Sequence, residues 1–168
     1  MKSDRLSSAP FAVAEAGVMV ALAATLYMIS FARLPYGGKL SLEMLPIFFV
    51  SFRRGWKVGI LAGFALGIII LALDPMVVHP AQFILDYPLP HIFVGMSSLF
   101  SKNTAGAITL GGLGRFLCHF LSGIIFFGSF APPEIPVWVY SLFYNGFYIL
   151  PQLAAAMLIF PVLFKRLK

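Results

Sequence analysis

Residues 114–151 read GRFLCHFLSGIIFFGSFAPPEIPVWVYSLFYNGFYILP, and this stretch indicates what kind of protein the chain is. It is apolar enough to lie in a membrane, yet it contains Arg115, His119, Glu134, Tyr140 and Asn145. Polar groups at membrane depth are costly, and they usually face a cavity or the interior of a helix bundle. The stretch is therefore compatible with a polar pocket, and equally with ordinary helix packing around one satisfied histidine.

The spacing of three residues suggests where such a pocket would lie. On an ideal helix, His119 and Phe127 are about 80° apart and about 12 Å along the axis. Gly123 falls between them in angle, and its missing side chain predicts a hollow between an imidazole and an aromatic ring. Such a hollow suits a flat, polar, cationic molecule.

The composition of the whole chain indicates an integral membrane protein. Of its 168 residues, 60% are hydrophobic and only 11% are charged, whereas soluble domains have about a quarter of their residues charged. The basic residues that give a net charge of +6 are dispersed, which is typical of topology signals and not of a nucleic-acid surface. The polar residues 1–10 are expected to be a cytosolic lead-in, because no signal-peptide cleavage site follows them.

Hydrophobic runs predict an all-α bundle of six transmembrane helices in a single membrane domain. The expected spans are residues 11–32, 41–52, 58–73, 81–100, 105–130 and 136–164. The third span contains Gly59, Gly63 and Gly67 at four-residue spacing, which predicts close helix contacts. Pro88 and Pro90 are expected to break the fourth span, and Pro151 the sixth.

The distribution of Lys and Arg orients the bundle. With both termini in the cytosol, nine basic residues lie in inside segments and two in outside segments. Cytoplasmic loops carry an excess of Lys and Arg, so the loops at residues 33–40, 74–80 and 131–135 are expected to face outwards. A pocket near His119 and Asn145 would then open to the outside of the cell.

The first span carries two small-residue stripes, one formed by Ala12 and Ala16 and the other by Gly17 and Ala21. Small residues at this spacing let helix backbones approach closely in lipid. From the residues alone, either stripe is compatible with packing inside the bundle or against another protein, and packing inside the bundle is slightly favoured.

Signatures of common enzymes are absent from the sequence. There is no phosphate-binding GxxxxGK[ST] loop, no HExxH motif and no GxSxG motif. The three histidines are too scattered for a metal site, and Cys118 is the single cysteine. We therefore expect no enzymatic activity and no cofactor.

A set of residues suited to binding a ligand remains. Asp86 supplies an anion that can accept hydrogen bonds from an amino group, and Asn145 can both donate and accept. Flat faces for stacking or cation–π contact with a charged heterocycle come from Tyr87, His119, Phe127 and Tyr140. Tyr36, in the first outer loop, is compatible either with a lid over the cavity or with an interfacial aromatic anchor.

Four runs of sequence carry a resemblance to a known family. They are GGKLSLEMLPIFFVSFRRGWKVGILAGFALGI (residues 37–68), LDYPL (residues 85–89), GRFLCHFLSGIIFFGSFAP (residues 114–132) and YSLFYNGFYILP (residues 140–151). In order and spacing they resemble the thiamine-specific substrate-binding (S) components of energy-coupling factor transporters, the ThiT or YuaJ family. The resemblance implies a six-helix S-component bundle with an outward-facing thiamine site.

The resemblance also implies which residues bind. The acidic–tyrosine pair of the family falls on Asp86 and Tyr87, and its histidine, tyrosine and asparagine fall on His119, Tyr140 and Asn145. The family usually has Glu at the position of Asp86 and Trp at that of Phe127, so this chain has a shorter carboxylate and a weaker stacking face. The aromatic lid of the family corresponds to Tyr36.

Partners and cellular location follow from the same resemblance. S components dock through small residues of their first helix onto a transmembrane coupling protein that carries two ATPases, in the plasma membrane of a prokaryote. This shifts the expected role of the stripes Ala12/Ala16 and Gly17/Ala21 towards docking of that protein. The alternatives are an S component for a thiamine precursor or another vitamin, and a stand-alone proton-coupled carrier that uses Asp86 or Glu15.

Overall fold

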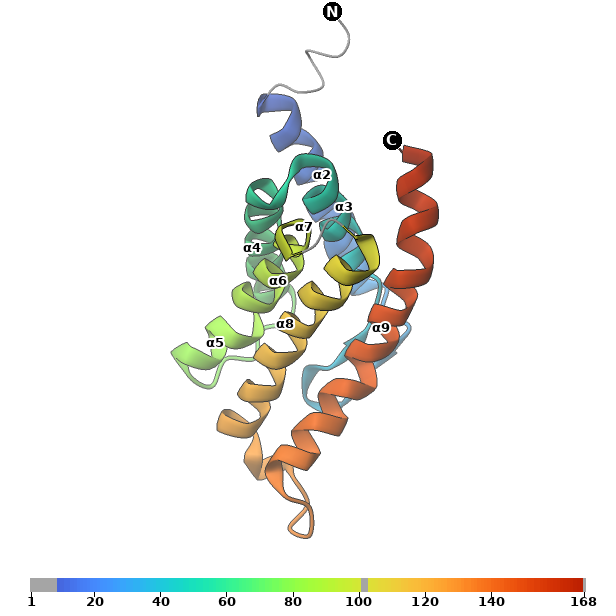
Figure 1. Cartoon of the computed structure of the whole chain (residues 1–168). Helices are drawn as coiled ribbons and strands as arrows, with labels where there is room; N and C mark the ends of the chain where they lie inside the picture. The colour runs from blue at the N-terminus through green and yellow to red at the C-terminus, as the bar shows by residue number, and fades with distance from the viewer. Residues whose placement is uncertain (1–8, 101–102, 168) are drawn as a thin grey trace, which may run out of the picture.

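Helices form almost all of the computed structural model, which describes residues 9–100 and 103–167 (Figure 1). The helices are α2 (Ala9–Met28), α3 (Met44–Arg54), α4 (Trp56–Leu73), α5 (Pro80–Asp86), α6 (Pro88–Gly95), α7 (Ser97–Phe100), α8 (Thr104–Phe126) and α9 (Val137–Leu167). The predicted cytosolic lead-in, apart from its last two residues, lies outside the described residues. The expected all-α class is confirmed, with one small addition in the loop between α2 and α3.

Within the described residues, four helices are long and apolar enough to cross a membrane: Ala9–Met28, Trp56–Leu73, Thr104–Phe126 and Val137–Lys165. They account for four of the six predicted spans. The second predicted span is the 11-residue helix α3, which at 1.5 Å per residue is about 16 Å long. The fourth is divided among α5, α6 and α7.

The fourth predicted span is broken as expected, but by one proline only. Helix α5 ends at Asp86, and Pro88 begins α6. Pro90 lies within the first turn of α6 and does not interrupt it, because the N–H groups of a first turn have no helical partner in any case. The break places Asp86 and Tyr87 at the junction of two helices.

Two other predicted boundaries are wrong. Helix α9 runs continuously through Pro151, so the expected interruption of the sixth span is absent. Helix α8 ends at Phe126 and not at residue 130, and a short 3-10 helix η2 (Gly128–Phe130) follows it. Phe127 is therefore the C-cap residue of α8, and its ring is not positioned by helical geometry.

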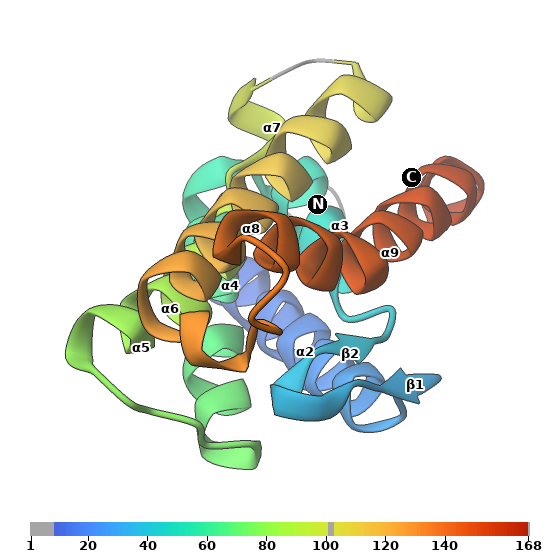
Figure 2. The same ribbon diagram turned by 90° about the horizontal axis from the view of Figure 1, so that it is seen from below.

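The loop between α2 and α3 forms a short hairpin. Strand β1 (Ala32–Arg33) pairs antiparallel with β2 (Lys39–Leu40), and the 3-10 turn η1 (Pro35–Gly37) joins them. Tyr36 and Gly37 both have positive φ angles, 64° and 99°, which makes the turn sharp. In Figure 2, a view from the end opposite the two termini, this hairpin and the α4–α5 connection lie on the viewer's side of the bundle.

The glycines of α4 make the predicted close helix contacts. A Cβ atom at Gly59, Gly63 or Gly67 would overlap the backbone carbonyl of Gly95, His91 or Tyr87 respectively. Because these contacts join the backbones of two helices, no side chain can move aside to make room. The glycine stripe of α4 therefore fixes the position of α6, and with it the residues at the α5–α6 junction.

Replacing Gly63 by Ala is expected to destabilise the protein by about 1–3 kcal/mol, the usual cost of overpacking. The new methyl group would overlap the His91 carbonyl oxygen, so α4 and α6 must separate. Thermal unfolding in detergent measures the effect. Gly17→Ala is the matched control, because a Cβ there meets no atom within 4 Å; an equal loss of stability in both variants would contradict the prediction.

Candidate ligand-binding site

A chamber of about 320 Å³ lies between α4, α5, α6, α8, α9 and the hairpin. This volume is at the lower end of the range for small-molecule sites. The seven residues predicted to bind a ligand all line it: Tyr36, Asp86, Tyr87, His119, Phe127, Tyr140 and Asn145. Residues that are more than 100 positions apart in sequence thus share one cavity.

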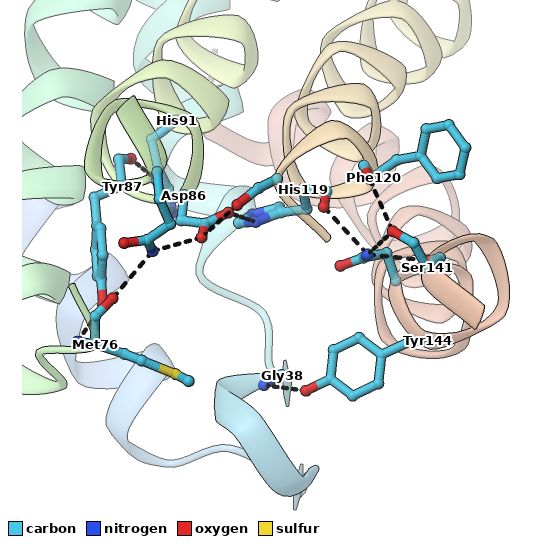
Figure 3. A network of polar contacts seen from close by, with 12 residues as sticks. Gly38, Met76, Asp86, Tyr87, His91, His119, Phe120, Ser141 and Tyr144 are labelled. Carbon is cyan, nitrogen blue, oxygen red and sulfur yellow. Dashed lines mark hydrogen bonds and ion pairs between the residues drawn. The ribbon is translucent and has the colours of Figure 1, made fainter. Parts of the chain in front are cut away.

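Asp86 is the centre of a polar network on one wall of the chamber (Figure 3). Its Oδ2 atom accepts hydrogen bonds from Gln82 Nε2 at 2.6 Å and from Ser122 Oγ at 2.8 Å. Its Oδ1 atom lies 3.1 Å from His119 Nδ1. These contacts fix the carboxylate in one orientation at the C-terminal end of α5.

The tautomer of His119 follows from this network. Because a carboxylate oxygen accepts hydrogen bonds, the proton lies on Nδ1. The opposite ring nitrogen, Nε2, is buried and has no hydrogen-bond partner among the described residues. A buried polar atom without a partner is costly, so a ligand that engages His119 Nε2 removes an existing penalty.

Asn145, in contrast, is already fully oriented. Its Nδ2 donates to the Ser141 carbonyl at 2.9 Å and lies 3.2 Å from Ser141 Oγ, and its Oδ1 accepts from the Tyr148 hydroxyl at 3.0 Å. The amide oxygen has two lone pairs, so one remains for a ligand donor. Asn145 therefore offers an acceptor to the chamber and has no N–H to spare.

Tyr87 supports the wall through its hydroxyl group. The hydroxyl accepts from the Met76 N–H at 2.7 Å and lies 3.0 Å from the Asp74 carbonyl. Only 6% of the residue is exposed. Tyr87 thus connects the α5–α6 junction to the α4–α5 loop and presents its ring to the chamber.

An aromatic stack covers one side of the chamber. The rings of Tyr36 and Phe130 are 4.0 Å apart and nearly parallel, and Phe130 stacks on Phe127 with a centroid distance of 5.8 Å. The Tyr144 hydroxyl accepts from the Gly38 N–H and donates to the Pro35 carbonyl. The hairpin is thereby held against α9 and the region after α8.

Gly123 lines the chamber together with His119 and Phe127, as predicted. A Cβ on Gly123 would overlap Ser141 Oγ of α9, so the glycine permits close approach of two helices. Phe127 lies beyond the end of α8, which removes the helical geometry on which the expectation depended. The chamber is bounded by the helices, the β1–β2 hairpin and the α4–α5 loop.

An ion pair that the sequence analysis missed joins those loops. Lys39 Nζ lies 2.6 Å from Asp74 Oδ2 and 4.0 Å from the centre of the Tyr27 ring. The Tyr27 hydroxyl also donates to Asp74 Oδ2 at 3.1 Å. Contact with Lys39 and the Tyr27 hydroxyl lowers the pKa of Asp74 below its ordinary value of 3.8, although partial burial opposes this shift.

This ion pair predicts a loss of stability in acid. A carboxylate whose pKa is lowered by folding stabilises the protein above its ordinary pKa and ceases to do so as pH falls through the lowered value. The unfolding temperature is therefore expected to fall more steeply below about pH 4 in the unmodified protein than in Asp74→Asn. Lys39→Gln should flatten the profile in the same way, and a profile unchanged by either substitution would exclude the effect.

A second ion pair lies deeper and includes the chamber-lining residue Arg115. Arg115 Nη1 is 2.6 Å from Glu43 Oε1, and the two side chains are 5% and 1% exposed. Glu43 Oε2 and Arg115 Nε are buried and have no hydrogen-bond partner in the part of the chain that the structure describes. Glu43, which the sequence analysis did not single out, is thus more deeply buried than Asp86.

Two further lining residues, Tyr144 and Tyr148, were missed although the sequence carried a signal for them. Tyr140, Tyr144 and Tyr148 recur at four-residue spacing, which places their side chains on one face of α9. All three line the chamber. Gln82 and Ser122 carried no such signal, because their role depends on the contact between α5 and α8.

Comparison with known proteins identifies the family. Residues 13–168 match the family described as Thiamine transporter protein (Thia_YuaJ). This chain belongs to that family. The family consists of transporters and not of enzymes, as the absence of catalytic motifs predicted.

Individual members of the Thia_YuaJ family agree with this assignment. Thiamine transporter ThiT of Bacillus subtilis is 35% identical over 169 residues, covering 89% of this chain and 88% of the relative. Thiamine transporter ThiT of Lacticaseibacillus paracasei is 34% identical and covers 64% of each chain. The solved structure of ThiT from Listeria monocytogenes has a TM-score of 0.82 over 92% of this chain at 24% identity, which supports the fold.

Proposed function

We propose that this chain is the thiamine-binding S component of an ATP-driven energy-coupling factor importer. The observation that carries the proposal is the charge of the chamber. Lys39 is paired with Asp74, and Arg115 with Glu43, whereas Asp86 has no Lys or Arg partner among the described residues. With the histidines neutral, the chamber has a formal charge of −1, which complements a ligand of charge +1 such as thiamine.

The two rings of thiamine fit the two kinds of lining. We assign the aminopyrimidine to Asp86 and Asn145, whose oxygens would accept hydrogen bonds from its amino group. The cationic thiazolium would lie against the faces of His119, Phe127 and Tyr87, where cation–π attraction is available. Tyr140 would contribute a further aromatic face, and Tyr36, stacked on Phe130, would close the chamber as a lid.

For topology, we propose six membrane crossings with cytosolic termini in the plasma membrane of a prokaryote. Helix α3 and the α5–α7 segment would form the two crossings that are not continuous long helices. Their non-helical breaks line the chamber or are packed inside the bundle, the places where broken backbone is tolerated in membranes. The chamber would then open to the outside of the cell.

For partners, we propose that a transmembrane coupling protein with two ATPases docks on α2. Ala12 is half-buried and Ala16 is 9% exposed, whereas Gly17 and Ala21 are exposed. Exposure therefore favours the Gly17/Ala21 stripe over the Ala12/Ala16 stripe as the docking contact. Close backbone approach at small residues would supply the packing in lipid.

Titration of the purified protein with thiamine tests the proposal. We expect saturable binding in the nanomolar range, followed by tryptophan fluorescence, and a loss of at least about tenfold in His119→Ala, which removes a hydrogen-bonding group and a ring from the chamber. Trp138, on the first turn of α9 and two positions before the chamber residue Tyr140, is the expected reporter. Absence of binding at micromolar thiamine would exclude the proposal.

Two further measurements, of ligand preference and of uptake, address the two alternatives. Binding of the pyrimidine fragment in preference to thiamine would indicate an S component for a precursor. Uptake that follows a pH gradient without any ATPase would indicate a proton-coupled carrier. Glu15, one of the two residues suggested for such a carrier, is engaged in ion pairs with Arg53 and Arg54.

A further inference from the structure

His91 of α6 is a histidine of the chamber that the proposed function does not use. It lines the chamber, and only 3% of the residue is exposed. Its Nδ1 atom lies 2.6 Å from the carbonyl oxygen of Tyr87 (Figure 3). Because a carbonyl oxygen accepts hydrogen bonds and does not donate them, the proton lies on Nδ1. This bond fixes both the tautomer and the orientation of the ring.

The other ring nitrogen of His91 is left without a partner. Nε2 is buried and makes no hydrogen bond within residues 9–100 and 103–167. A second proton on the ring would place a charge in a buried site within the field of the Arg115 guanidinium, which is costly, so the imidazole is neutral. Nε2 therefore carries a lone pair that can accept a hydrogen bond. A ligand group that donates to it removes the penalty of an unmatched buried acceptor.

His91 lies one helical turn deeper than the groups assigned to the thiazolium ring. Tyr87, the N-cap of α6, precedes His91 by four positions, and Arg115 precedes His119 by four positions on α8. Such pairs lie on one face of a helix, about 6 Å apart along its axis. The end of α8 lies at the aromatic stack that contacts the hairpin. His91 and Arg115 therefore form a level below Tyr87 and His119, farther from the hairpin.

The chemistry of this inner level favours a neutral hydrogen-bond donor. A carboxylate has no proton to donate. An ammonium group can donate, but the cationic ring already neutralises the formal charge of −1, so a second buried positive charge would be unmatched. A hydroxyl group donates a hydrogen bond without carrying a charge. Nε2 of His91 is thus suited to a hydroxyl group on an arm that extends inwards from the cationic ring.

We propose that His91 is a specificity-determining residue, whose Nε2 atom accepts a hydrogen bond from a hydroxyl group on a short alkyl arm of the ligand. In thiamine this arm is the hydroxyethyl substituent of the thiazolium ring. The contact selects hydroxylated ligands, because an analogue that lacks the hydroxyl leaves a buried acceptor unpaired. The inference rests on the proposed function and refines the ligand class that the chamber accepts.

Comparison of thiamine with its deoxy analogue, in which ethyl replaces hydroxyethyl, tests the inference. The two ligands have the same rings and the same charge. We expect the unmodified protein to bind the analogue at least about tenfold more weakly, the usual effect of leaving a buried polar group unpaired. Calorimetric titration gives the ratio of the two dissociation constants. A structural defect in the chamber weakens both ligands alike, so this ratio reports the hydroxyl contact.

Two substitutions of His91 separate the roles of its ring nitrogens. In His91→Asn the side-chain amide replaces Nδ1 and leaves no group at the position of Nε2, so the ratio should fall to roughly one. In His91→Gln the amide reaches the position of Nε2 and should retain part of the discrimination. His79→Asn is the matched control, because His79 is an exposed N-cap residue of α5, a position that Asn also favours. Its ratio should equal that of the unmodified protein.

Nuclear magnetic resonance of the unmodified protein provides a test that does not depend on the folding of the His91 variants. The chain has three histidines, so the ring-nitrogen signals of isotope-labelled histidine can be assigned with His79→Asn and His119→Ala. We expect the Nε2 signal of His91 to shift when thiamine binds, because the nitrogen then accepts a hydrogen bond. With the deoxy analogue bound, the same signal should stay near its position in the free protein.

Three results would overturn the inference while leaving the proposed function intact. They are equal binding of the two ligands by the unmodified protein, an unchanged ratio in a folded His91→Asn protein, and a His91 Nε2 signal that responds to both ligands alike. In each case thiamine still binds, and the hydroxyl group is not recognised by His91. If neither ligand binds at micromolar concentration, the proposed function fails and the inference fails with it.

Discussion

Asp86→Asn is expected to weaken thiamine binding by about 100-fold or more, which corresponds to about 2.7 kcal/mol. The substitution preserves the size of the side chain and removes the formal negative charge of the chamber. It also replaces one carboxylate oxygen by an NH₂ group, which faces the donors Gln82 Nε2 and Ser122 Oγ or the Nδ1–H of His119. A cationic ligand thereby loses a charged hydrogen-bond partner. Repulsion between the new NH₂ group and the neighbouring donors also disturbs the site to which the ligand binds.

Glu134→Gln is the matched control for this experiment. Glu134 is an exposed carboxylate in the α8–α9 connection, and its substitution makes the same change of net charge outside the chamber. Calorimetric titration of both variants with thiamine measures the difference. If both variants bind equally well, Asp86 does not contact the ligand and the charge argument for the chamber fails.

The sequence was sufficient to predict seven of the residues that line the chamber, because polar groups in an apolar chain are few. Each of the seven proposed residues faces the same cavity. The helix class and the glycine contacts of α4 were predictable for the same local reasons, periodicity and spacing. The break near Pro88 followed from the chemistry of proline.

The sequence was not sufficient where a contact joins distant segments. Lys39 and Asp74 are 35 positions apart, and Glu43 and Arg115 are 72 apart, so no local pattern relates the members of either pair. The end of α8 at Phe126 also depends on its surroundings, since the sequence remains apolar beyond it. Gly123 lines the chamber as predicted, but its close contact with Ser141 could not be predicted, because that contact depends on the position of α9.

Breaking the Glu43–Arg115 pair is expected to destabilise the protein more than any other substitution considered. Removing one member of a buried ion pair leaves an uncompensated charge, at a cost of about 3–5 kcal/mol. For a chain of this size, that lowers the unfolding temperature by roughly 6–20 °C. Glu43→Leu and Arg115→Met should both show this effect in thermal unfolding, and the double variant should recover most of the lost stability.

Ligand binding by the same variants separates the structural role of the pair from its effect on the chamber. Glu43→Leu leaves Arg115 unpaired beside the chamber and changes the formal charge from −1 to 0, so thiamine binding should weaken. Arg115→Met changes the formal charge to −2, so the folded fraction should bind the cation at least as well as the unmodified protein. The double variant restores −1, and its affinity should return with its stability. If the double variant recovers its stability but not its affinity for thiamine, Arg115 contacts the ligand directly. If the three variants bind thiamine equally well, the formal charge of the chamber does not control cation binding.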